Sequence, residues 1–339
     1  MEPLIDESSV TTGRGPSAEP AVADTAAERV IARGKSPTAI ALTRLRKDRV
    51  AMICAVIVLL FVLIAVFAPL LAKIEGQDTT TLHQDLVDQY GFPTIGPNSE
   101  HWFGVEPRLG RDLFARFVYG ARPSLIVATS ATVISTIIGV IIGLLTGFLG
   151  GWTDRILSWV IDFVLSLPYL LFAIAVPAVL LAVFVGNAEG ADPNQVATVR
   201  FYSLIMVLSF LGWAGLARLI RGEVLSLRER EFIAAAKVIG VPTGKVLFKE
   251  LLPNLVAPIV VATSLSLPAY VTAEAGLSYL GIGITGIPSL GQTINDAQDY
   301  WSLYPLYLWA PVLTITVLVL ALNLLGDSVR DAFDPRTRR

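Results

Sequence analysis

Two glycine patterns in the chain resemble nucleotide-binding motifs, and neither meets the requirements of that chemistry. Gly281-Ile-Gly283-Ile-Thr-Gly286 has the spacing of a dinucleotide fingerprint, which needs a strand before it and a helix after it. Here a long apolar run precedes it and a loop with glycine and proline follows. Gly240-Val-Pro-Thr-Gly244-Lys245-Val246 is one residue short of a phosphate-binding loop, and Val246 has no hydroxyl for magnesium. We therefore expect no cofactor in this chain, so that any ATP and magnesium would be bound by another polypeptide.

The side chains that commonly carry enzyme or metal chemistry are scarce. Cys54 is the only cysteine and lies inside an apolar run, and His83 and His101 are the only histidines. The chain has no HExxH pattern and no cysteine–histidine cluster, which predicts that it has no metal site. No nucleophile–base pair is visible, so we expect a protein that is not an enzyme. A net charge of −2 gives no indication of a nucleic-acid partner.

Two carboxylates, Asp162 and Glu274, lie near the ends of apolar runs. Ionisable groups at membrane depth are energetically expensive and are candidates for function. Close to an interface they can also reach water or a local partner. A purely structural role is therefore an equal alternative for each of them.

The apolar runs predict a membrane protein that is all-α. The chain is 54% hydrophobic and 16% charged, whereas soluble domains contain about 25% charged residues. A bilayer core needs about 20 residues of helix. Six segments qualify, at residues 50–71, 124–149, 156–185, 202–220, 255–273 and 306–325. The first is too long and begins too late for a cleaved signal peptide.

Proline interrupts the third apolar segment at Pro168 and Pro177. The segment is therefore either one kinked helix or a re-entrant pair, and we favour one helix. With six spans, both termini lie on the same side of the membrane.

Positive charges indicate which side that is, because cytoplasmic loops carry an excess of Lys and Arg. With a cytoplasmic amino terminus, 20 of the 26 Lys and Arg residues fall in cytoplasmic segments. The loop 279–305 has none. Both termini and the segment 221–253 are therefore expected in the cytoplasm, and membrane lipid is an expected partner.

Two further patterns concern organisation. Residues 1–35 are rich in Ala, Pro, Ser, Thr and Glu and contain no aromatic residue, which predicts a disordered cytoplasmic tail before a membrane domain at 36–339. Ser36-Pro37 is typical of a helix start. Small residues recur every fourth position in the second apolar run, and such spacing lets membrane helices pack closely. We favour packing within this chain over contact with another subunit for the stripe of Ala131, Ser135, Gly139, Gly143, Gly147 and Gly151.

The segment after Glu231 predicts a compact helical elbow outside the bilayer. Its apolar positions follow the spacing i, i+3, i+4 and i+7, which places them on one face of a short helix. Gly240 is a natural stop, and Pro242 cannot continue that helix. A second short helix is expected from Pro242 to Leu252. An ordinary amphipathic loop helix is the alternative explanation for the face formed by Phe232, Ala235, Ala236 and Ile239.

This elbow resembles the cytoplasmic coupling loop of ABC importer permeases. The family loop reads Glu-Ala-Ala, three residues, Gly, nine residues, Ile, one residue and Leu-Pro. Ala234-Ala235-Ala236, Gly240 and Leu252-Pro253 fit this spacing, whereas Ala234 replaces the Glu and Glu250 replaces the Ile. The run from Phe232 to Lys237 is most similar to the C-type permeases of the dipeptide/oligopeptide branch.

The resemblance extends over nearly all of the chain after Ser36. The matching segments, in order, are 43–71, His101-Trp102-Phe103-Gly104, Leu109-Gly110-Arg111-Asp112, 274–283, Pro288-Ser289-Leu290-Gly291 and Ala321-Leu-Asn323-Leu-Leu-Gly326-Asp327. Val105-Glu106 departs from a family Gly-Thr-Asp, and Leu290 stands where Trp is usual.

The resemblance implies a six-helix type I importer permease in a bacterial plasma membrane, with di- or oligopeptides as the substrate. It implies a second homologous permease, two cytoplasmic ATPase subunits and an extracytoplasmic substrate-binding protein as partners. The same machinery importing nickel, glutathione or an oligosaccharide stays an alternative, and an ion-driven secondary transporter is a more distant one. Glu274 is a weak candidate for the substrate pathway. The residues that the resemblance assigns to ATPase coupling are Glu231, Phe232, Ala235, Ala236, Ile239 and Gly240.

Overall fold

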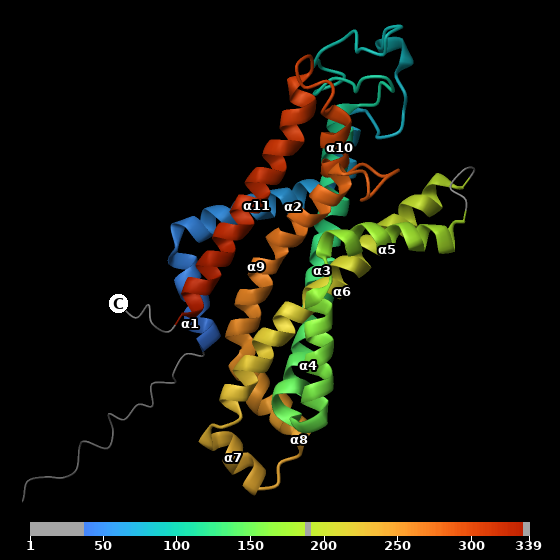
Figure 1. Cartoon of the computed structure of the whole chain (residues 1–339). Coiled ribbons are helices and arrows are strands. Elements are labelled where there is room, and N and C mark those ends of the chain that lie inside the picture. The colour runs from blue at the N-terminus through green and yellow to red at the C-terminus, as the bar shows by residue number, and fades with distance from the viewer. Residues whose placement is uncertain (1–36, 187–190, 335–339) are drawn as a thin grey trace, which may run out of the picture. The chain divides into compact units, whose positions relative to one another are not determined.

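The computed structural model describes residues 37–186 and 191–334 and is built from helices (Figure 1). Within those residues the only β-type pairings are two isolated bridges. The expected tail 1–35 and the expected cap Ser36 lie outside the described residues. The elements are α1 (Pro37–Lys47), α2 (Arg49–Glu75), η1 (Gln84–Leu86), α3 (Leu113–Leu149), α4 (Gly151–Ser166), α5 (Tyr169–Phe184), α6 (Pro193–Leu227), α7 (Glu231–Val238), α8 (Thr243–Lys245), η2 (Val246–Leu251), α9 (Leu252–Tyr279), α10 (Leu290–Ala297) and α11 (Pro305–Phe333).

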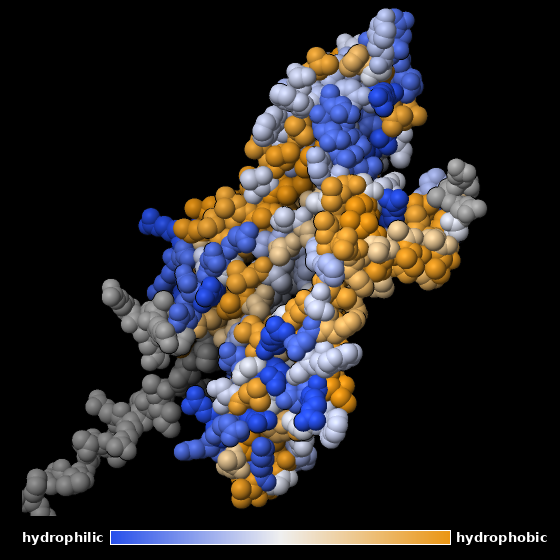
Figure 2. All heavy atoms as spheres, viewed as in Figure 1, coloured by the Kyte–Doolittle hydropathy of each residue, from blue (hydrophilic) through white to orange (hydrophobic). Residues whose placement is uncertain are grey.

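Five helical stretches of the described chain are long and apolar enough to cross a bilayer. They contain α2, α3, α6, α9 together with the short elements before it, and α11. Hydrophobic side chains cover α5 and α11 on the face seen in Figure 2, and hydrophilic ones gather over the loop 76–112 and around α1. The exposed apolar residues on α2 include Ile53, Val56 and Leu59. Such surfaces are suited to lipid rather than to water.

The third predicted span is a broken element, so the favoured single helix was wrong. α4 and α5 together pass the same length and hydropathy test, but they meet at an angle of 90°. Leu167 at the junction has an extended backbone (φ −69°, ψ 129°), because the ring of the following Pro168 disfavours the helical conformation there. Pro177, in contrast, is accommodated inside α5. The described residues therefore contain up to six candidate spans if the bent pair is counted as one.

The small-residue stripe of α3 packs against α6 of the same chain, as favoured from the sequence. A Cβ atom on Gly143 would lie 2.7 Å from Cβ of Ile220, and one on Gly147 would lie 2.7 Å from Cβ of Val224. At Gly139 the nearest atom would be the backbone oxygen of Trp213, at 2.9 Å. Real Cβ atoms almost never approach so closely, so this helix pair depends on glycine.

We expect Gly143→Leu to destabilise the protein strongly. Overpacking a close helix contact typically costs about 1–3 kcal/mol or more, and here the backbone oxygen of Ala217 would lie 2.8 Å from the new Cβ. The measurement is the midpoint of thermal unfolding of the purified protein in detergent. Gly222→Leu is the matched control, because Gly222 lies on α6 and a Cβ added there would meet no atom within 4 Å. Equal midpoints for the two variants would contradict the assigned packing.

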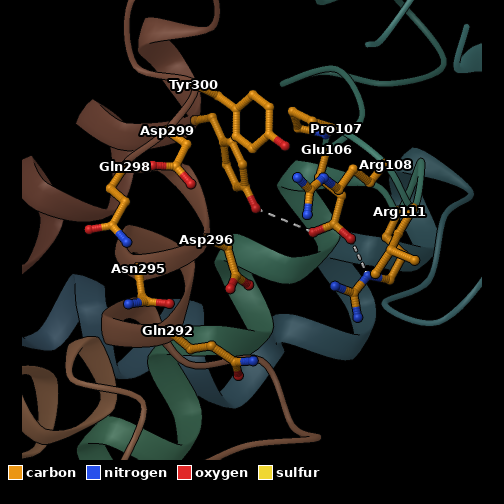
Figure 3. A pocket seen from close by; sticks show the side chains of 12 residues that line it. Glu106, Pro107, Arg108, Arg111, Gln292, Asn295, Asp296, Gln298, Asp299 and Tyr300 are labelled. Carbon is orange, nitrogen blue, oxygen red and sulfur yellow. Dashed lines mark hydrogen bonds and ion pairs between the residues drawn. The ribbon is translucent and has the colours of Figure 1, made fainter. Parts of the chain in front are cut away.

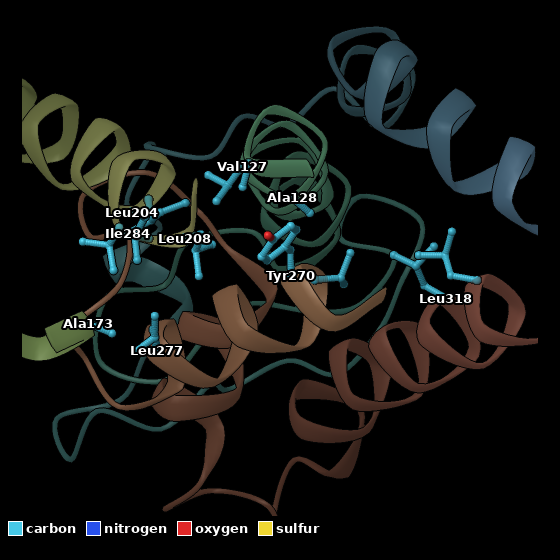
Figure 4. Packing of buried hydrophobic residues seen from close by; sticks show 13 residues of the cluster. Val127, Ala128, Ala173, Leu204, Leu208, Tyr270, Leu277, Ile284 and Leu318 are labelled. Carbon is cyan, nitrogen blue, oxygen red and sulfur yellow. The ribbon is translucent and has the colours of Figure 1, made fainter. Parts of the chain in front are cut away.

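A second core joins α3, α5, α6, α9 and α11 (Figure 4). Tyr270 on α9 reaches into it and donates its hydroxyl to Oγ of Ser135 on α3, at 3.0 Å. A Cβ on Gly212 of α6 would collide with that hydroxyl oxygen, which explains the glycine. The labelled members of this core are Val127, Ala128, Ala173, Leu204, Leu208, Tyr270, Leu277, Ile284 and Leu318.

Candidate functional site

The predicted elbow helix is confirmed as α7, and its end has the predicted cause. Gly240 has a φ of +79°, a left-handed conformation that glycine adopts without strain. Its N–H donates to the Lys237 oxygen at 3.0 Å, and the N–H of Val241 donates to the Ala236 oxygen at 3.0 Å. These two bonds form a Schellman motif, which ends the helix and turns the chain back.

The two faces of α7 differ from the prediction at one residue. Ile233 (0% exposed) and Ala236 (8%) face inward and pack with Val246, Leu251 and Val224. Ala236 therefore packs in the chain's own core and not on the exposed face with Phe232 and Ile239. Its role in ATPase coupling stays a prediction. Ile233 and Ala236 are three residues apart and share the inner face, whereas Ala235 lies on the opposite side of the helix.

The exposed face of α7 is apolar at its carboxyl end. Ile239 is 79% exposed and Phe232 is 40% exposed. Ala235 and Glu231 are exposed as well. Val238, which the sequence pattern did not single out, is 88% exposed. Apolar residues in water next to small ones are suited to an apolar groove on another protein.

The second predicted elbow helix, from Pro242 to Leu252, was wrong as a separate element. α8, η2 and α9 form one continuous helical stretch from Thr243 to Tyr279. η2 is a π turn, in which the N–H of Leu252 donates to the oxygen of Leu247, five residues back. Pro253 follows directly and has no N–H for the regular ladder, and π turns absorb such interruptions. The returning arm of the elbow is therefore a direct extension of a span.

Contacts from α7 and its neighbours reach several helices. Nζ of Lys237 lies 5.2 Å from the ring centroid of Phe148 at the end of α3. Nη1 of Arg228 donates to the oxygen of Gly147 at 3.2 Å. Arg221 on α6 makes a bidentate ion pair with Asp154 on α4, at 2.6 and 2.9 Å. These contacts join the elbow and its surroundings to α3, α4, α6 and α9.

The two carboxylates in the apolar runs have different surroundings. Asp162 pairs with Arg218, and both side chains are more than half exposed, which fits the structural alternative for Asp162. Glu274 is completely buried, and its Oε1 accepts from Oγ of Ser278 at 2.7 Å. Its Oε2 has no hydrogen-bond partner among the described residues. Glu274 therefore faces the interior of this chain and no open surface, and its place in a substrate pathway stays a prediction.

At the end of the bundle away from α7, the loop 76–112 and α10 lie close together (Figure 1). Glu106 in that loop pairs with Arg111 and with Nε of Arg116, the latter at 3.2 Å. Nη2 of Arg116 lies 3.8 Å from Oδ2 of Asp296 on α10. Burial raises the pKa of the Asp296 carboxyl above its ordinary value, and the nearby Arg116 opposes this. The ion pairs of Arg116 on α3 therefore connect the loop, through Glu106, with α10, through Asp296.

The motif residues of the loop have local structural roles. Asp112 caps α3, because its Oδ1 accepts from the N–H of Ala115 at 2.7 Å, and its Oδ2 lies 2.8 Å from Nδ1 of His101. Gly110 has a φ of +67°, and a Cβ there would lie 2.5 Å from the backbone oxygen of His83. The sequence located this motif without revealing that it builds the wall of a pocket.

That pocket has a volume of about 330 Å³ and lies between the loop and α10 (Figure 3). Charged side chains from the loop form one wall and the other wall is made of carboxylates and amides of the α10 region. Such a lining can bind a polar ligand or a charged segment of a protein. The lining residues are Glu106, Pro107, Arg108, Leu109, Arg111, Gln292, Asn295, Asp296, Gln298, Asp299, Tyr300 and Tyr307.

Comparison with known families and proteins gives consistent results. Residues 139–339 match the family described as binding-protein-dependent transport system inner membrane component. Residues 36–87 match the amino-terminal transmembrane domain of oligopeptide transport permease C. The chain resembles the oligopeptide transport system permease protein OppC of Bacillus subtilis, with 33% identity over 323 residues, covering 95% of this chain and 97% of OppC.

Two further relatives cover most of the chain. The dipeptide permease DppC of Bacillus subtilis is 36% identical, covering 87% of this chain and 85% of DppC. The glutathione permease GsiD of Escherichia coli is 34% identical, covering 87% of this chain and 89% of GsiD. An inward-facing structure of the MetNI methionine ABC transporter has a TM-score of 0.47 and 18% identity, covering 65% of this chain and 96% of that one.

The family match covers more than half of the chain, and relatives above 30% identity extend along almost all of it. The helical fold and the elbow that ends at Gly240 agree with that assignment. The chain therefore belongs to the binding-protein-dependent inner membrane transport components and is a transmembrane permease of the ABC importer type.

Proposed function

We propose that this permease imports di- or oligopeptides as one of two transmembrane subunits of the transporter. The observation that carries the proposal is the similarity to an oligopeptide permease over 95% of the chain. Two cytoplasmic ATPase subunits supply the energy, and an extracytoplasmic binding protein delivers the peptide. This chain itself holds no nucleotide.

In this proposal, α7 is the part on which the ATPases act. Its exposed residues Phe232, Ala235 and Ile239 enter a groove of the ATPase, and each large apolar side chain contributes about 1.5–3 kcal/mol if fully buried. Closure of the ATPases moves the elbow, and the helices that contact it rock as nearly rigid bodies. Ile233 supports this role, because it anchors α7 in the core beneath it.

Glutathione is a second candidate substrate, because a glutathione permease is 34% identical to this chain. Its import would require the same coupling surface and the same partners. A protein driven by an ion gradient would instead need charged groups along a pathway. Residues 50–71 and 255–273 contain no charge, which favours the ATP-driven mechanism.

The function is tested by reconstituting the chain with its partner permease, its ATPases and its binding protein in liposomes. We expect uptake of labelled di- and tripeptides that requires ATP, and an ATPase rate that rises several-fold with peptide-loaded binding protein. Glutathione, nickel and an oligosaccharide serve as competitors. ATP-dependent uptake of one of these without any uptake of peptides would refute the proposed substrate class, and hydrolysis by this chain alone would refute the division of labour.

The orientation of the chain in the membrane gives a separate prediction. It is based on the 20 Lys and Arg residues in the expected cytoplasmic segments against 6 in the expected outer segments. Cysteines replacing Ser8 and Thr243 should be protected from an impermeant thiol reagent in intact cells, and a cysteine replacing Asn295 should react. Native Cys54 is buried and provides an unreactive background. Labelling of the Thr243 variant from outside would show that the orientation is inverted.

A further inference from the structure

The pocket between the loop 76–112 and α10 has properties of a binding site that the coupling mechanism does not use. Its two walls come from segments that are far apart in the sequence, and its volume is about 330 Å³. Pockets for small molecules begin at about 300 Å³. The space is therefore adequate for a very small ligand or for the end of a larger one.

Most charges of the pocket neutralise one another, and two remain. Glu106 is compensated by Arg111 and Arg116, and Asp296 lies near Arg116. Arg108 and Asp299 are exposed, and neither forms an ion pair with any residue between 37 and 186 or between 191 and 334. Figure 3 shows them on opposite walls, Arg108 from the loop and Asp299 from the segment after α10.

Three side-chain amides of the α10 wall also have unused hydrogen-bonding capacity. Oε1 of Gln292 is buried without a partner among the described residues, and buried polar atoms in folded proteins are usually satisfied by protein, water or ligand. Nδ2 of Asn295 donates to the oxygen of Tyr279 at 2.7 Å, and Oε1 of Gln298 accepts from the Tyr279 hydroxyl at 3.3 Å. Oδ1 of Asn295 and Nε2 of Gln298 therefore remain for other partners.

The position of Arg108 is defined by the backbone around it. Its N–H donates to the oxygen of Gly91 at 2.8 Å, and Gln84 Nε2 donates to its carbonyl oxygen at 3.3 Å. Its φ is +67°, which is the only positive value among the described residues that are not glycine. The backbone from which the Arg108 side chain extends is thus held in a hydrogen-bonded turn.

We propose that this pocket binds a small zwitterion, namely the backbone of a short peptide with free termini. The peptide carboxylate pairs with the guanidinium of Arg108, and the peptide ammonium pairs with the carboxylate of Asp299. The unpartnered Oε1 of Gln292 on the same wall is available to accept a hydrogen bond from the peptide. One positive and one negative charge on facing walls match the two ends of such a molecule. A cation alone would leave Arg108 unpaired, and an anion alone would leave Asp299 unpaired.

The inference deepens the proposed function, because it gives the permease a peptide site of its own besides that of the binding protein. A site with one ion pair at each end in water holds its ligand weakly, since exposed ion pairs contribute little. Weak binding suits a permease, because the ligand must leave again.

The test uses the complete complex of both permeases and the ATPases in nanodiscs, without binding protein and without nucleotide. Dialanine is the probe, and N-acetyl-dialanine and dialanine amide each lack one terminal charge. Affinity is measured by saturation-transfer NMR. We expect the affinity for dialanine to fall about two- to fivefold in Asp299→Asn and in Arg108→Gln, which is the loss expected for one solvent-exposed ion pair. Asp85→Asn, a loop aspartate outside the pocket lining, is the matched control and should bind as wild type does.

A crossed pattern identifies which wall holds which terminus. Acetylation should weaken binding to the wild type and have no further effect in Asp299→Asn, and amidation should have no further effect in Arg108→Gln. Equal binding of all three probes, or unchanged dialanine binding in both variants, would overturn the proposal. Binding protein is titrated in a separate measurement. Variants that lose affinity for it but bind dialanine as wild type does would also overturn the proposal, because the pocket would then be a protein docking site. The uptake experiment is independent: peptide transport without dialanine binding refutes only this site, and dialanine binding without peptide transport refutes only the function.

Discussion

Ala235→Glu should abolish peptide uptake, whereas Ala234→Glu should leave it largely intact. Both residues are exposed on α7, and adjacent positions on a helix point about 100° apart. Ala235 shares its face with Phe232 and Ile239, the apolar residues that we assign to the ATPase groove. A carboxylate in that groove would be buried without a partner, which costs several kcal/mol. Ala234 is the position at which the permease family usually carries Glu, so a carboxylate there is compatible with the complex.

The measurements are uptake of a labelled dipeptide in cells and the amount of ATPase that co-purifies with the permease. We expect at least a tenfold loss of both for Ala235→Glu, with normal amounts of the permease in the membrane. Since Ala235 is exposed on α7, the fold should persist, and an unchanged thermal midpoint in detergent is the control. Wild-type uptake by Ala235→Glu would show that α7 does not transmit the motion.

Glu274→Lys should prevent the protein from folding, and Glu274→Gln should not. Glu274 is 0% exposed and lies among Phe61, Leu125, Val271, Leu290 and Leu318. A lysine there would bury a positive charge with no carboxylate nearby and would remove the acceptor of the Ser278 hydroxyl. The loss of a buried polar partner and an unpaired buried charge together cost several kcal/mol, which is comparable to the whole stability of a domain.

Glutamine keeps both the shape of the side chain and an oxygen that accepts from Ser278. The Glu274→Gln variant should therefore accumulate in the membrane and unfold at a midpoint near that of the wild type. Its uptake rate should change by only a few-fold, and the order in which peptides compete should stay the same. A reversed order of competing peptides, with the same binding protein, would show that Glu274 itself contacts the substrate.

Ser278 connects this carboxyl group to the segment that leads to α10. Its Oγ donates to Glu274 and accepts from the N–H of Ile284 at 3.3 Å. A Cβ on Gly291 would collide with the backbone oxygen of Ala275, so α10 packs directly against α9. Glu274 thus stabilises the arrangement that forms the second wall of the pocket, although it is not part of the lining.

Features that depend on local composition and spacing follow from the amino-acid sequence alone. The apolar runs predicted the spans because helix length must match bilayer thickness. Five of the six runs lie in α2, α3, α6, α9 and α11, and the third lies in the bent pair α4–α5. Gly240 predicted the end of α7, because a helix end of this kind requires only a residue that adopts the left-handed backbone conformation. The small-residue stripe predicted a close helix contact, because the spacing of small side chains along one helix face can be read from the sequence.

The partner that each of these features meets depends instead on the three-dimensional fold. Spacing placed Ala235 and Ala236 on one side, but Ala236 is buried together with Ile233 in the core cluster that also contains Leu251. Local pattern could not distinguish a kink from a 90° break at Pro168, since that angle depends on the helices that α4 and α5 contact. Glu274 is enclosed by residues from several helices. Arg108 and Asp299 line opposite walls of one pocket because the α10 region lies against the loop, an arrangement of distant segments that local pattern does not encode.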